Sequence, residues 1–413
     1  MAVVESRGST LLLVCVIVSA CGGQAGDRRA GVGADGVSRH DSAGVEIVDV
    51  AASAVERPAL LRIAPEPLLV LEGAGTTSSR LFSDIFAVFR TPGGTIGVVD
   101  RRISAVHLFD TTGRLLRTVG RSGKGPGEFL QIATVVPLPG DSLIVQEWRT
   151  SLLSVFGPDG RFVRQVLLAP PPLHQRAHLL SRYPDGGLLA VSPAPEHGPP
   201  RLGLVSTRQH VLGYSHDSAS GRVLATGLDR ELVFRPGGPE LVDAARFLRP
   251  FGARGNVRAV PDGFLMGDGR MFEVMRYTRD GRLQRSLRVA LQGPGLTAAL
   301  RTAENARMAQ IYRGGVLRAR FEAFWADAPF PPTAPAFARF EVDAHGRLWI
   351  EAYPGEEGER TKWFVFTPDA QPLGCVEMPA GFALHQVVES AVLGVQTRDD
   401  GSQVVIVYHL EEG

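Results

Sequence analysis

Three carboxylates occupy matching places in a pattern that repeats along the chain, and they are the residues best able to do chemistry. Asp100, Glu147 and Asp268 each follow the second apolar run of a repeat, and Ser192 and Ala352 stand at that place in two other repeats. A ring of carboxylate oxygens near one mouth of a central channel could bind a divalent cation. An Asp at such a place more often accepts hydrogen bonds from backbone N–H groups in a turn. A divalent cation is therefore the only cofactor considered, and no metal site is firmly assigned.

Two other stretches contain the residue types of a zinc site or a phosphate-binding loop but lack the sequence pattern of either. His174 and His178 are four residues apart, as zinc ligands on one helix would be, but no Glu follows His174 as in a metalloprotease. The glycine-rich stretch 120–128 resembles a phosphate loop, but Gly125 stands where Ser or Thr must follow the lysine, and Pro126 lacks an N–H. We interpret this stretch as a structural turn. No constellation indicates catalysis, so enzyme activity is undecided, with the balance against it.

The composition is that of a turn-rich β protein with a nearly neutral surface. The 413 residues include 48 Gly and 29 Pro, and 44 Lys and Arg balance 43 Asp and Glu, for a net charge of +1. Turn residues are needed in quantity where many short strands follow one another. A nucleic-acid partner would require a concentration of positive charge, which is missing here. We therefore expect no nucleic-acid binding.

The stretch Asp84–Phe129 indicates the elements that must position any site. Four short apolar runs are separated by turn clusters at 92–94, 100–102 and 110–113, as in a four-stranded antiparallel meander. A second copy lies 47 residues further on, measured from Gly113 to Gly160, and weaker copies follow, although 216–255 fit none of them firmly. A period of 40 to 50 residues with four strands per unit is the signature of a β-propeller. The sequence predicts an all-β fold with six four-stranded blades.

The two ends of the repeat pattern complement each other. The run 67–73 looks like a fourth strand without the first three, and the last unit, ending near Leu410, has only three strands. An N-terminal strand that completes the last blade would close the ring and leave no free sheet edge there. Between the fourth and fifth units, at about 296–328, the apolar period changes to that of two helices, which we expect to be inserted between blades.

The N-terminus predicts export and a lipid anchor. An apolar run at 11–18, too short to span a bilayer, precedes Ser19, Ala20 and Cys21. This arrangement resembles the lipobox of bacterial lipoprotein signals, which implies that 1–21 are the signal with its lipobox and that Cys21 carries lipid. Gly22 after the cysteine implies, by the same resemblance, the outer membrane if the cell has two membranes. Residues 22–44 are expected to be a flexible tether, and 45–413 the propeller.

The repeats resemble a known group. The segment 92–120 resembles an NHL-type repeat, and 123–129 is similar to the link between blades in bacterial six-bladed β-propeller lipoproteins. The resemblance implies the fold and a place in the cell envelope, and it implies no catalytic residues. We expect a binding or interaction module for a protein or glycan partner. The alternative is a metal-dependent hydrolase or lactonase with a carboxylate site at the channel, an analogy from fold alone.

Overall fold

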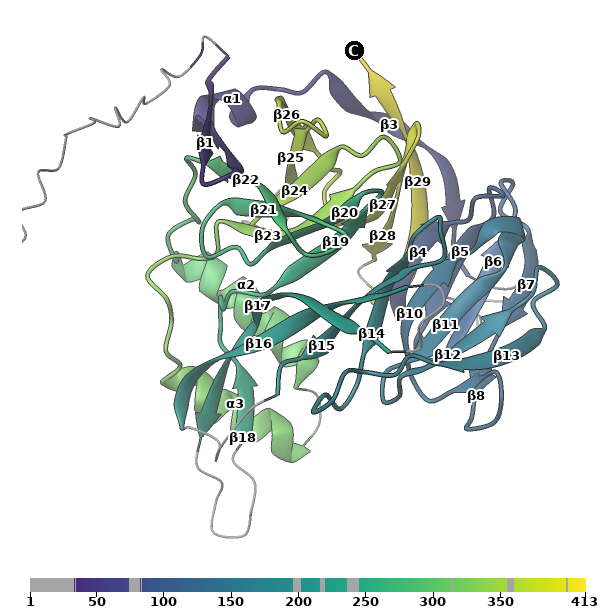
Figure 1. The fold of residues 1–413 in the computed structure, drawn as a ribbon. Coiled ribbons are helices and arrows are strands. Elements are labelled where there is room, and N and C mark those ends of the chain that lie inside the picture. The colour runs from purple at the N-terminus through teal and green to yellow at the C-terminus, as the bar shows by residue number, and fades with distance from the viewer. Residues whose placement is uncertain are drawn as a thin grey trace, which may run out of the picture.

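The computed structural model of the chain is built almost entirely from antiparallel sheets (Figure 1). It describes residues 33, 35–73, 82, 84–195, 202–215, 220–235, 245–312, 315–354, 360–398 and 400–413. The signal sequence and the predicted lipidation site, Cys21, lie outside the described residues. Within the described residues, none of the helices has the length and apolar character needed to cross a membrane.

The first two sheets are the meanders that the sequence predicts. Each has four antiparallel strands in chain order, joined by short turns. The first sheet contains β4 (Ile85–Arg90), β5 (Ile96–Asp100), β6 (Ala105–Phe109) and β7 (Leu115–Val119). The second contains β10 (Ile132–Pro137), β11 (Leu143–Glu147), β12 (Leu152–Phe156) and β13 (Phe162–Leu167).

The third sheet has five strands and includes much of the segment that the repeat pattern did not place. Its strands are β14 (His178–Arg182), β15 (Leu188–Pro193), β16 (Gly203–Tyr214), β17 (Arg222–Arg235) and β18 (Ala245–Leu248). The strands β16 and β17 form a long hairpin with two register shifts, which lets polar and apolar residues change face along its length. This irregular alternation explains why the sequence pattern was hard to recognise.

The fourth sheet is extended by the N-terminal part of the chain. Its own strands are β19 (Asn256–Val260), β20 (Gly263–Gly267), β21 (Glu273–Thr278) and β22 (Leu283–Val289). The hairpin of β1 (Val37–Ser42) and β2 (Val45–Val50) adds to it, with β2 parallel to β22. The expectation of a tether as far as residue 44 was therefore wrong for β1. Its turn is made by Ala43 and Gly44, both at positive φ (54° and 81°), and its order comes from backbone pairing rather than from apolar side chains.

The sixth sheet joins the two ends of the described chain. The fifth sheet has β23 (Phe337–Val342), β24 (Leu348–Ala352), β25 (Lys362–Phe366) and β26 (Pro372–Glu377). The sixth has β27 (Phe382–Val388), β28 (Ala391–Thr397) and β29 (Gln403–Glu412), and its fourth strand is β3 (Leu61–Leu71). The pairing of β29 with β3 is antiparallel and includes Val405 opposite Leu71. The predicted strand at 67–73 thus overlaps the C-terminal part of β3, which begins earlier and ends at Leu71.

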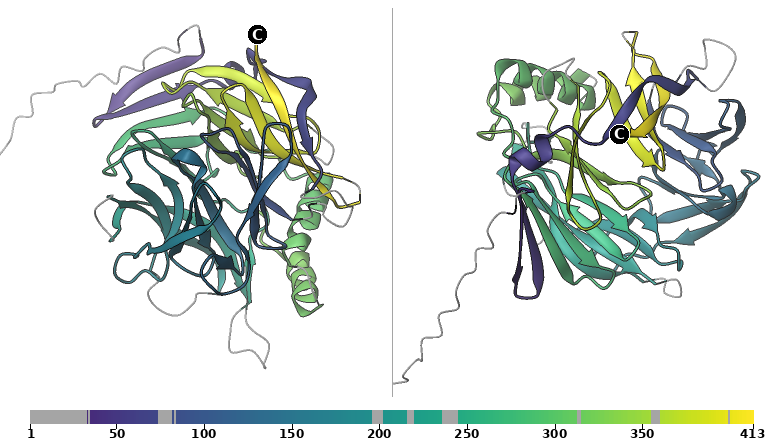
Figure 2. Two further views of the ribbon diagram at one scale, coloured as in Figure 1. Left: turned by 90° about the vertical axis from the view of Figure 1, so that its right-hand side faces the viewer. Right: turned by 90° about the horizontal axis from the view of Figure 1, so that it is seen from above.

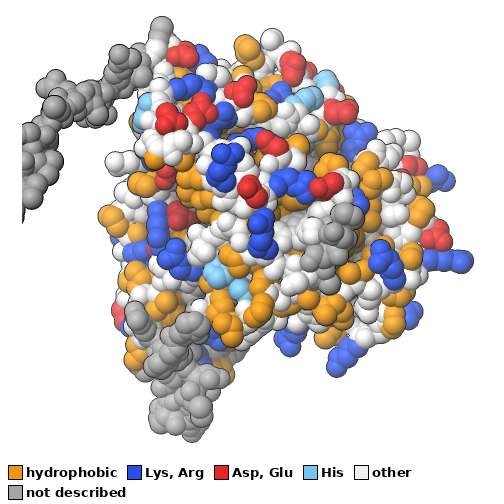
Figure 3. Space-filling view, in the orientation of Figure 1, with side chains coloured by type: hydrophobic (Ala, Val, Ile, Leu, Met, Phe, Trp, Pro, Cys, Tyr) orange, Lys and Arg blue, Asp and Glu red, His pale blue; other side chains and the backbone are white. Residues whose placement is uncertain are grey.

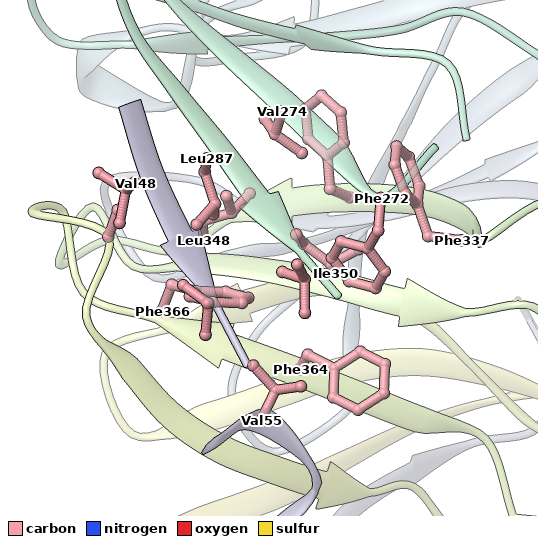
Figure 4. Close-up of a cluster of buried hydrophobic side chains, with 14 of the residues drawn as sticks. Val48, Val55, Phe272, Val274, Leu287, Phe337, Leu348, Ile350, Phe364 and Phe366 are labelled. Atoms are coloured by element: carbon pink, nitrogen blue, oxygen red, sulfur yellow. The ribbon is translucent and has the colours of Figure 1, made fainter. Parts of the chain in front are cut away.

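The six sheets are arranged in a ring with their first strands innermost. The first strands β10, β14, β19, β23, β27 and β4 contact one another in that order. Buried apolar clusters lie between neighbouring sheets, and the one between the fourth and fifth sheets is shown in Figure 4. Val48 of β2 and Val55 of the short helix α1 (Ala52–Glu56) are fully buried in that cluster. The N-terminal segment is therefore part of the folded core.

The side chains of two glutamines, one buried and one partly buried, connect neighbouring sheets. The Gln146 amide accepts a hydrogen bond from Leu179 N at 2.7 Å and donates one to Ala177 O at 2.6 Å, linking the second sheet to the third. Gln386 Oε1 of β27 accepts from Arg90 N of β4 at 2.6 Å, which links the sixth sheet to the first. Each such bond contributes about 1 kcal/mol and leaves a costly unpaired group if removed.

The predicted helical insertion is present as α2 (Ala298–Ile311) and α3 (Gly315–Ala326). Both helices lie on one side of the ring, beside the long strands of the third sheet (Figures 1 and 2). Phe321 and Phe324 of α3 are buried, and Phe324 stacks on Phe247 of β18 with ring centroids 4.6 Å apart. These aromatic side chains therefore pack against the ring. The Thr297 hydroxyl caps α2 by accepting from Leu300 N at 3.1 Å.

Candidate functional site

The carboxylates singled out in the sequence lie at the ends of second strands and in turns. Asp100 ends β5 and its Oδ1 accepts from Arg102 N at 2.9 Å, while Asp268 Oδ1 accepts from Arg270 N at 3.0 Å. Glu147 is the last residue of β11. The described part of the chain holds no group of three or more His, Cys, Asp or Glu side chains placed to bind a metal ion. Cation binding at Asp100, Glu147 and Asp268 stays a hypothesis, and the two aspartates have the turn role that was its alternative.

The two histidines of the sequence pair do not meet each other. His174 Nε2 lies 2.7 Å from His210 Nδ1 of β16, whereas His178 begins β14 and stacks on Trp148 at 5.1 Å between ring centroids. Burial lowers the pKa of His178, and the nearby Arg176 lowers it further. His174 lies in the loop before β14, so the helix that would bring two side chains four residues apart to one face is not formed.

The glycine-rich stretch is a structural turn, as the sequence predicts. The two-residue strands β8 (Arg121–Ser122) and β9 (Glu128–Phe129) pair across it. Glu128 Oε2 accepts from Gly125 N at 2.9 Å and Glu128 Oε1 accepts from Arg121 Nε at 2.8 Å. The N–H group that a phosphate would need is thus bound by the loop's own carboxylate.

A different group of charged residues lies where the inner strands of the fourth, fifth and sixth sheets meet. Arg258 of β19 binds Glu341 of β23 through two hydrogen bonds of 2.7 Å, a paired geometry that is strong and directional. Arg339 of β23 donates to Glu351 Oε2 at 2.6 Å, to Glu341 Oε1 at 3.2 Å and to Leu384 O of β27 at 2.6 Å. These contacts hold three inner strands in fixed register around the centre of the ring.

The pKa shifts follow from this network. Burial opposes ionisation of Glu341, yet Arg258 and Arg339 hold its pKa below the usual value. For Glu351 burial prevails over the attraction of Arg339, and its pKa is raised. His385 of β27 faces the same charges, and burial, followed by the Arg339 charge, lowers its pKa to about 4. The charged side chains of this network are still partly exposed to solvent, as is expected for groups at the centre of a ring.

A cavity of about 280 Å³ lies between this network and the helical insertion. Its walls come from α2, from the loop between β18 and β19, and from β23 and the end of β24. The lining is mostly apolar, with three arginines, two glutamates and one tyrosine among its members. The residues that the following argument uses are Phe251, Arg254, Leu300, Ala303, Glu304, Arg307, Phe337, Arg339, Glu351 and Tyr353.

Glu304 fixes the helix wall of the cavity. Its side chain is 5% exposed and accepts two hydrogen bonds of 2.6 Å from Arg307, one turn further along α2. It also accepts from Phe251 N at 3.3 Å. Phe251 is held at φ 52°, a left-handed conformation that is strained for a side chain of this size. Helix, loop and ion pair therefore brace one another before any ligand arrives.

Arg254 is the charged group of the cavity without a partner. Among the described residues its guanidinium makes no hydrogen bond or ion pair, in contrast to Arg307 and Arg339. The side chain is accessible to solvent, yet enclosure by the surrounding protein lowers its pKa, and the positive charge of Arg307 lowers it further. Burial also raises the pKa of the Tyr353 hydroxyl, as does the Glu304 carboxylate beside it. The cavity thus holds one uncompensated positive charge next to a neutral hydroxyl.

This group of residues has no direct signal in the sequence. Arg254, Arg307 and Glu351 belong to three different elements and are about 50 to 100 residues apart, so no short motif contains them. Nearly all basic residues of the chain are arginine, which hides a functional one among many. In the sequence, Glu304 and Arg307 show only the spacing of an ordinary i,i+3 ion pair.

Three other hollows are larger, at about 690, 510 and 500 Å³. The first two share Arg270 and Glu273, which bind Glu231 at 2.9 Å and Arg288 at 3.0 Å, respectively. The second also contains Arg208, whose guanidinium makes no hydrogen bond or ion pair among the described residues. On the face seen in Figure 3, acidic and basic side chains are interspersed among apolar ones and neither sign forms a continuous field. The cavity at Arg254 is the better candidate site because its mostly apolar walls are braced by ion pairs around a charged group that has no partner among the described residues.

Comparison with known families supports the fold. A family model described as a 6-bladed beta-propeller matches residues 71–136, from the end of β3 through the first sheet into β10. No curated protein matches the chain.

Solved structures of other proteins align with most of this chain at low identity. A putative exported protein from Bacteroides fragilis is 10% identical, with a TM-score of 0.47 over 89% of this chain and 99% of that one. A member of the DUF4221 family from Bacteroides vulgatus is 11% identical, with a TM-score of 0.49 over 86% and 99%. A gluconolactonase from Xanthomonas campestris is 11% identical, with a TM-score of 0.43 over 84% and 99%. Such distant likeness assigns no activity to this chain, whose six sheets and family match make it a six-bladed β-propeller.

Proposed function

We propose that this protein is an exported, lipid-anchored β-propeller with NHL-like repeats that acts as a binding module in the cell envelope. The observation that carries this is the cavity at Arg254, where a guanidinium without a partner among the described residues lies in a mostly apolar hollow whose walls are braced by ion pairs. A rigid hollow with one free charged group favours recognition of a ligand, because little ordering is left to be done on binding.

Binding is favoured over catalysis by the chemistry of the lining. It contains no Ser, Thr, Cys, His, Asp or Lys among the described residues that form it. Its two carboxylates, Glu304 and Glu351, are bound to Arg307 and Arg339 at 2.6 Å, so neither is free to accept a proton from a substrate. The alternative of a metal-dependent hydrolase or lactonase has no such observation in its favour.

The anchor is the second part of the proposal. Lipid on Cys21 would hold the propeller at a membrane, the outer membrane in a cell with two, and would leave the cavity available to a protein or glycan partner. Acyl chains supply membrane affinity in proportion to the apolar length that they bury.

The experiment is performed on the full chain expressed in a diderm bacterium, beside the Cys21→Ala variant. We expect the unchanged protein in the outer-membrane fraction, a diacylglyceryl mass on Cys21, and specific proteins or glycans recovered after crosslinking. The variant should leave the membrane fraction. An unmodified Cys21, or a variant that stays in the membrane, contradicts the anchor, and recovery of the propeller without any crosslinked partner contradicts the binding module.

A further inference from the structure

We propose that the cavity between α2 and the inner strands of the fifth sheet binds the carboxylate of a ligand whose adjoining part is apolar, with Arg254 as the carboxylate's partner. This deepens the proposed binding function by naming the ligand chemistry. It rests on three features of the cavity, which are its charge, its apolar wall and its rigidity.

The charge of the cavity selects a monoanion. Arg254, Arg307 and Arg339 line it, and Glu304 and Glu351 neutralise two of these three arginines. One positive charge remains, on the guanidinium that has no partner among the described residues. A carboxylate can take two parallel hydrogen bonds from such a planar fork. A phosphate dianion would leave one negative charge uncompensated beside two carboxylates, which is unfavourable in an enclosed site.

The remaining wall suits an apolar group next to that carboxylate. Phe251, Leu300, Phe337 and Tyr353 present apolar surface, and Phe251 and Tyr353 lie with ring centroids 5.9 Å apart. A volume of about 280 Å³ corresponds to roughly nine water molecules in the liquid. The cavity therefore accommodates an acid of about ten heavy atoms, such as an aryl-substituted short-chain acid or the last residue of a peptide.

Rigidity comes from contacts that are already made. The Arg307 guanidinium donates two hydrogen bonds to Glu304, and Glu304 also accepts a hydrogen bond from Phe251 N. Arg339 donates hydrogen bonds to Glu351 and to Leu384 O in the sixth sheet. Only Arg254 has to find its partner on binding, which limits the entropy cost and makes the carboxylate the selective group.

The test uses isothermal titration calorimetry on the full chain in detergent, with three probes that share one phenyl group. We expect 3-phenylpropionate to bind with a dissociation constant on the order of 0.1 to 1 mM, ordinary for a ligand of about ten heavy atoms. The neutral 3-phenylpropanol and the dianionic phenyl phosphate should bind at least about tenfold more weakly, because loss of a charge-assisted hydrogen bond costs a factor of this size. Equal binding of the acid and the alcohol overturns the proposal.

Two pairs of variants locate the site. Arg254→Gln should weaken binding of 3-phenylpropionate about ten- to a hundredfold, whereas Arg320→Gln, at a partly exposed arginine on α3 outside the cavity lining, should leave it unchanged. Ala303→Leu should fill the cavity and weaken the acid, whereas Ala306→Leu makes the same change on α2 outside the cavity lining. Undiminished binding by Arg254→Gln and Ala303→Leu contradicts the assignment.

The source of the carboxylate is decided by a second pair of probes. A tripeptide ending in phenylalanine is compared with its C-terminal amide. If the free peptide binds and the amide does not, the natural ligand is the end of a peptide, and if only 3-phenylpropionate binds, it is a free acid. Failure of both acids refutes the ligand class while leaving the membrane anchor and the crosslinked partner of the proposed function untouched.

Discussion

Protonation of His385 at the centre of the ring should destabilise the fold in weakly acidic solution. The pKa of this side chain is lowered from 6.5 to about 4 by burial and by the Arg339 charge. A base with a lowered pKa in the folded state contributes stability that is complete above pH 6.5 and is lost as the pH falls through 6.5 towards 4. Between pH 7.5 and pH 5 the unfolded histidine gains its proton and the folded one does not, which costs about 2 kcal/mol.

The assay compares urea unfolding of the unchanged protein and of His385→Gln at both pH values, so that the other titrating groups cancel. The unchanged protein should lose about 2 kcal/mol more than the variant on going to pH 5. The histidine signals in an NMR titration provide the direct check, with the variant identifying the His385 resonance. An ordinary pKa near 6.5 for that resonance, or equal losses for the two proteins, would refute the reasoning.

Three further changes test the ring and its turns by urea unfolding. Glu341→Gln should lower the free energy of unfolding by about 2–3 kcal/mol, which is less than for a fully buried pair because the Arg258 side chain is 34% exposed. The double variant with Arg258→Gln should be little less stable than Glu341→Gln alone, since the partner charge is then removed as well. Val48→Ala, at a fully buried position of β2, should cost about 2 kcal/mol, whereas Leu60→Ala, at a residue 69% exposed, should cost less than about 0.5 kcal/mol. Asp100→Ala should cost about 1 kcal/mol and Asp100→Asn less, since Asn keeps the acceptor for the turn. Calcium-dependent stabilisation of the unchanged protein, lost in both Asp100 variants, would instead indicate a cation site.

The repeated part of the fold could be predicted because each strand carries its own signal. Short apolar runs separated by the turn clusters at 92–94, 100–102 and 110–113 mark β4 to β7 without reference to the rest of the chain, and the period then predicts the number of sheets. The two helices could be predicted as well, because their apolar residues recur at helical spacing. Phe321 and Phe324 belong to this pattern, and both are buried in the structure.

What could not be predicted depends on pairing across long distances. The strand β1 has one large apolar residue, Val37, and is ordered by its pairing with β2 and by the parallel pairing of β2 with β22, far away in the chain. The cavity likewise forms only when α2, the loop before β19 and β23 come together. Arg254 looks like any other arginine in the sequence, because what distinguishes it is that its guanidinium has no hydrogen-bond or ion-pair partner among the described residues of the folded chain.

The most direct test of ligand recognition at Arg254 is a crystal of the protein soaked with 3-(4-bromophenyl)propionate, with data recorded at the bromine absorption edge. We expect an anomalous peak among Phe251, Leu300 and Tyr353, with the carboxylate of the same molecule hydrogen-bonded to the Arg254 guanidinium. An empty cavity at a saturating concentration of the acid, or a bound molecule whose carboxylate points away from Arg254, would contradict the account.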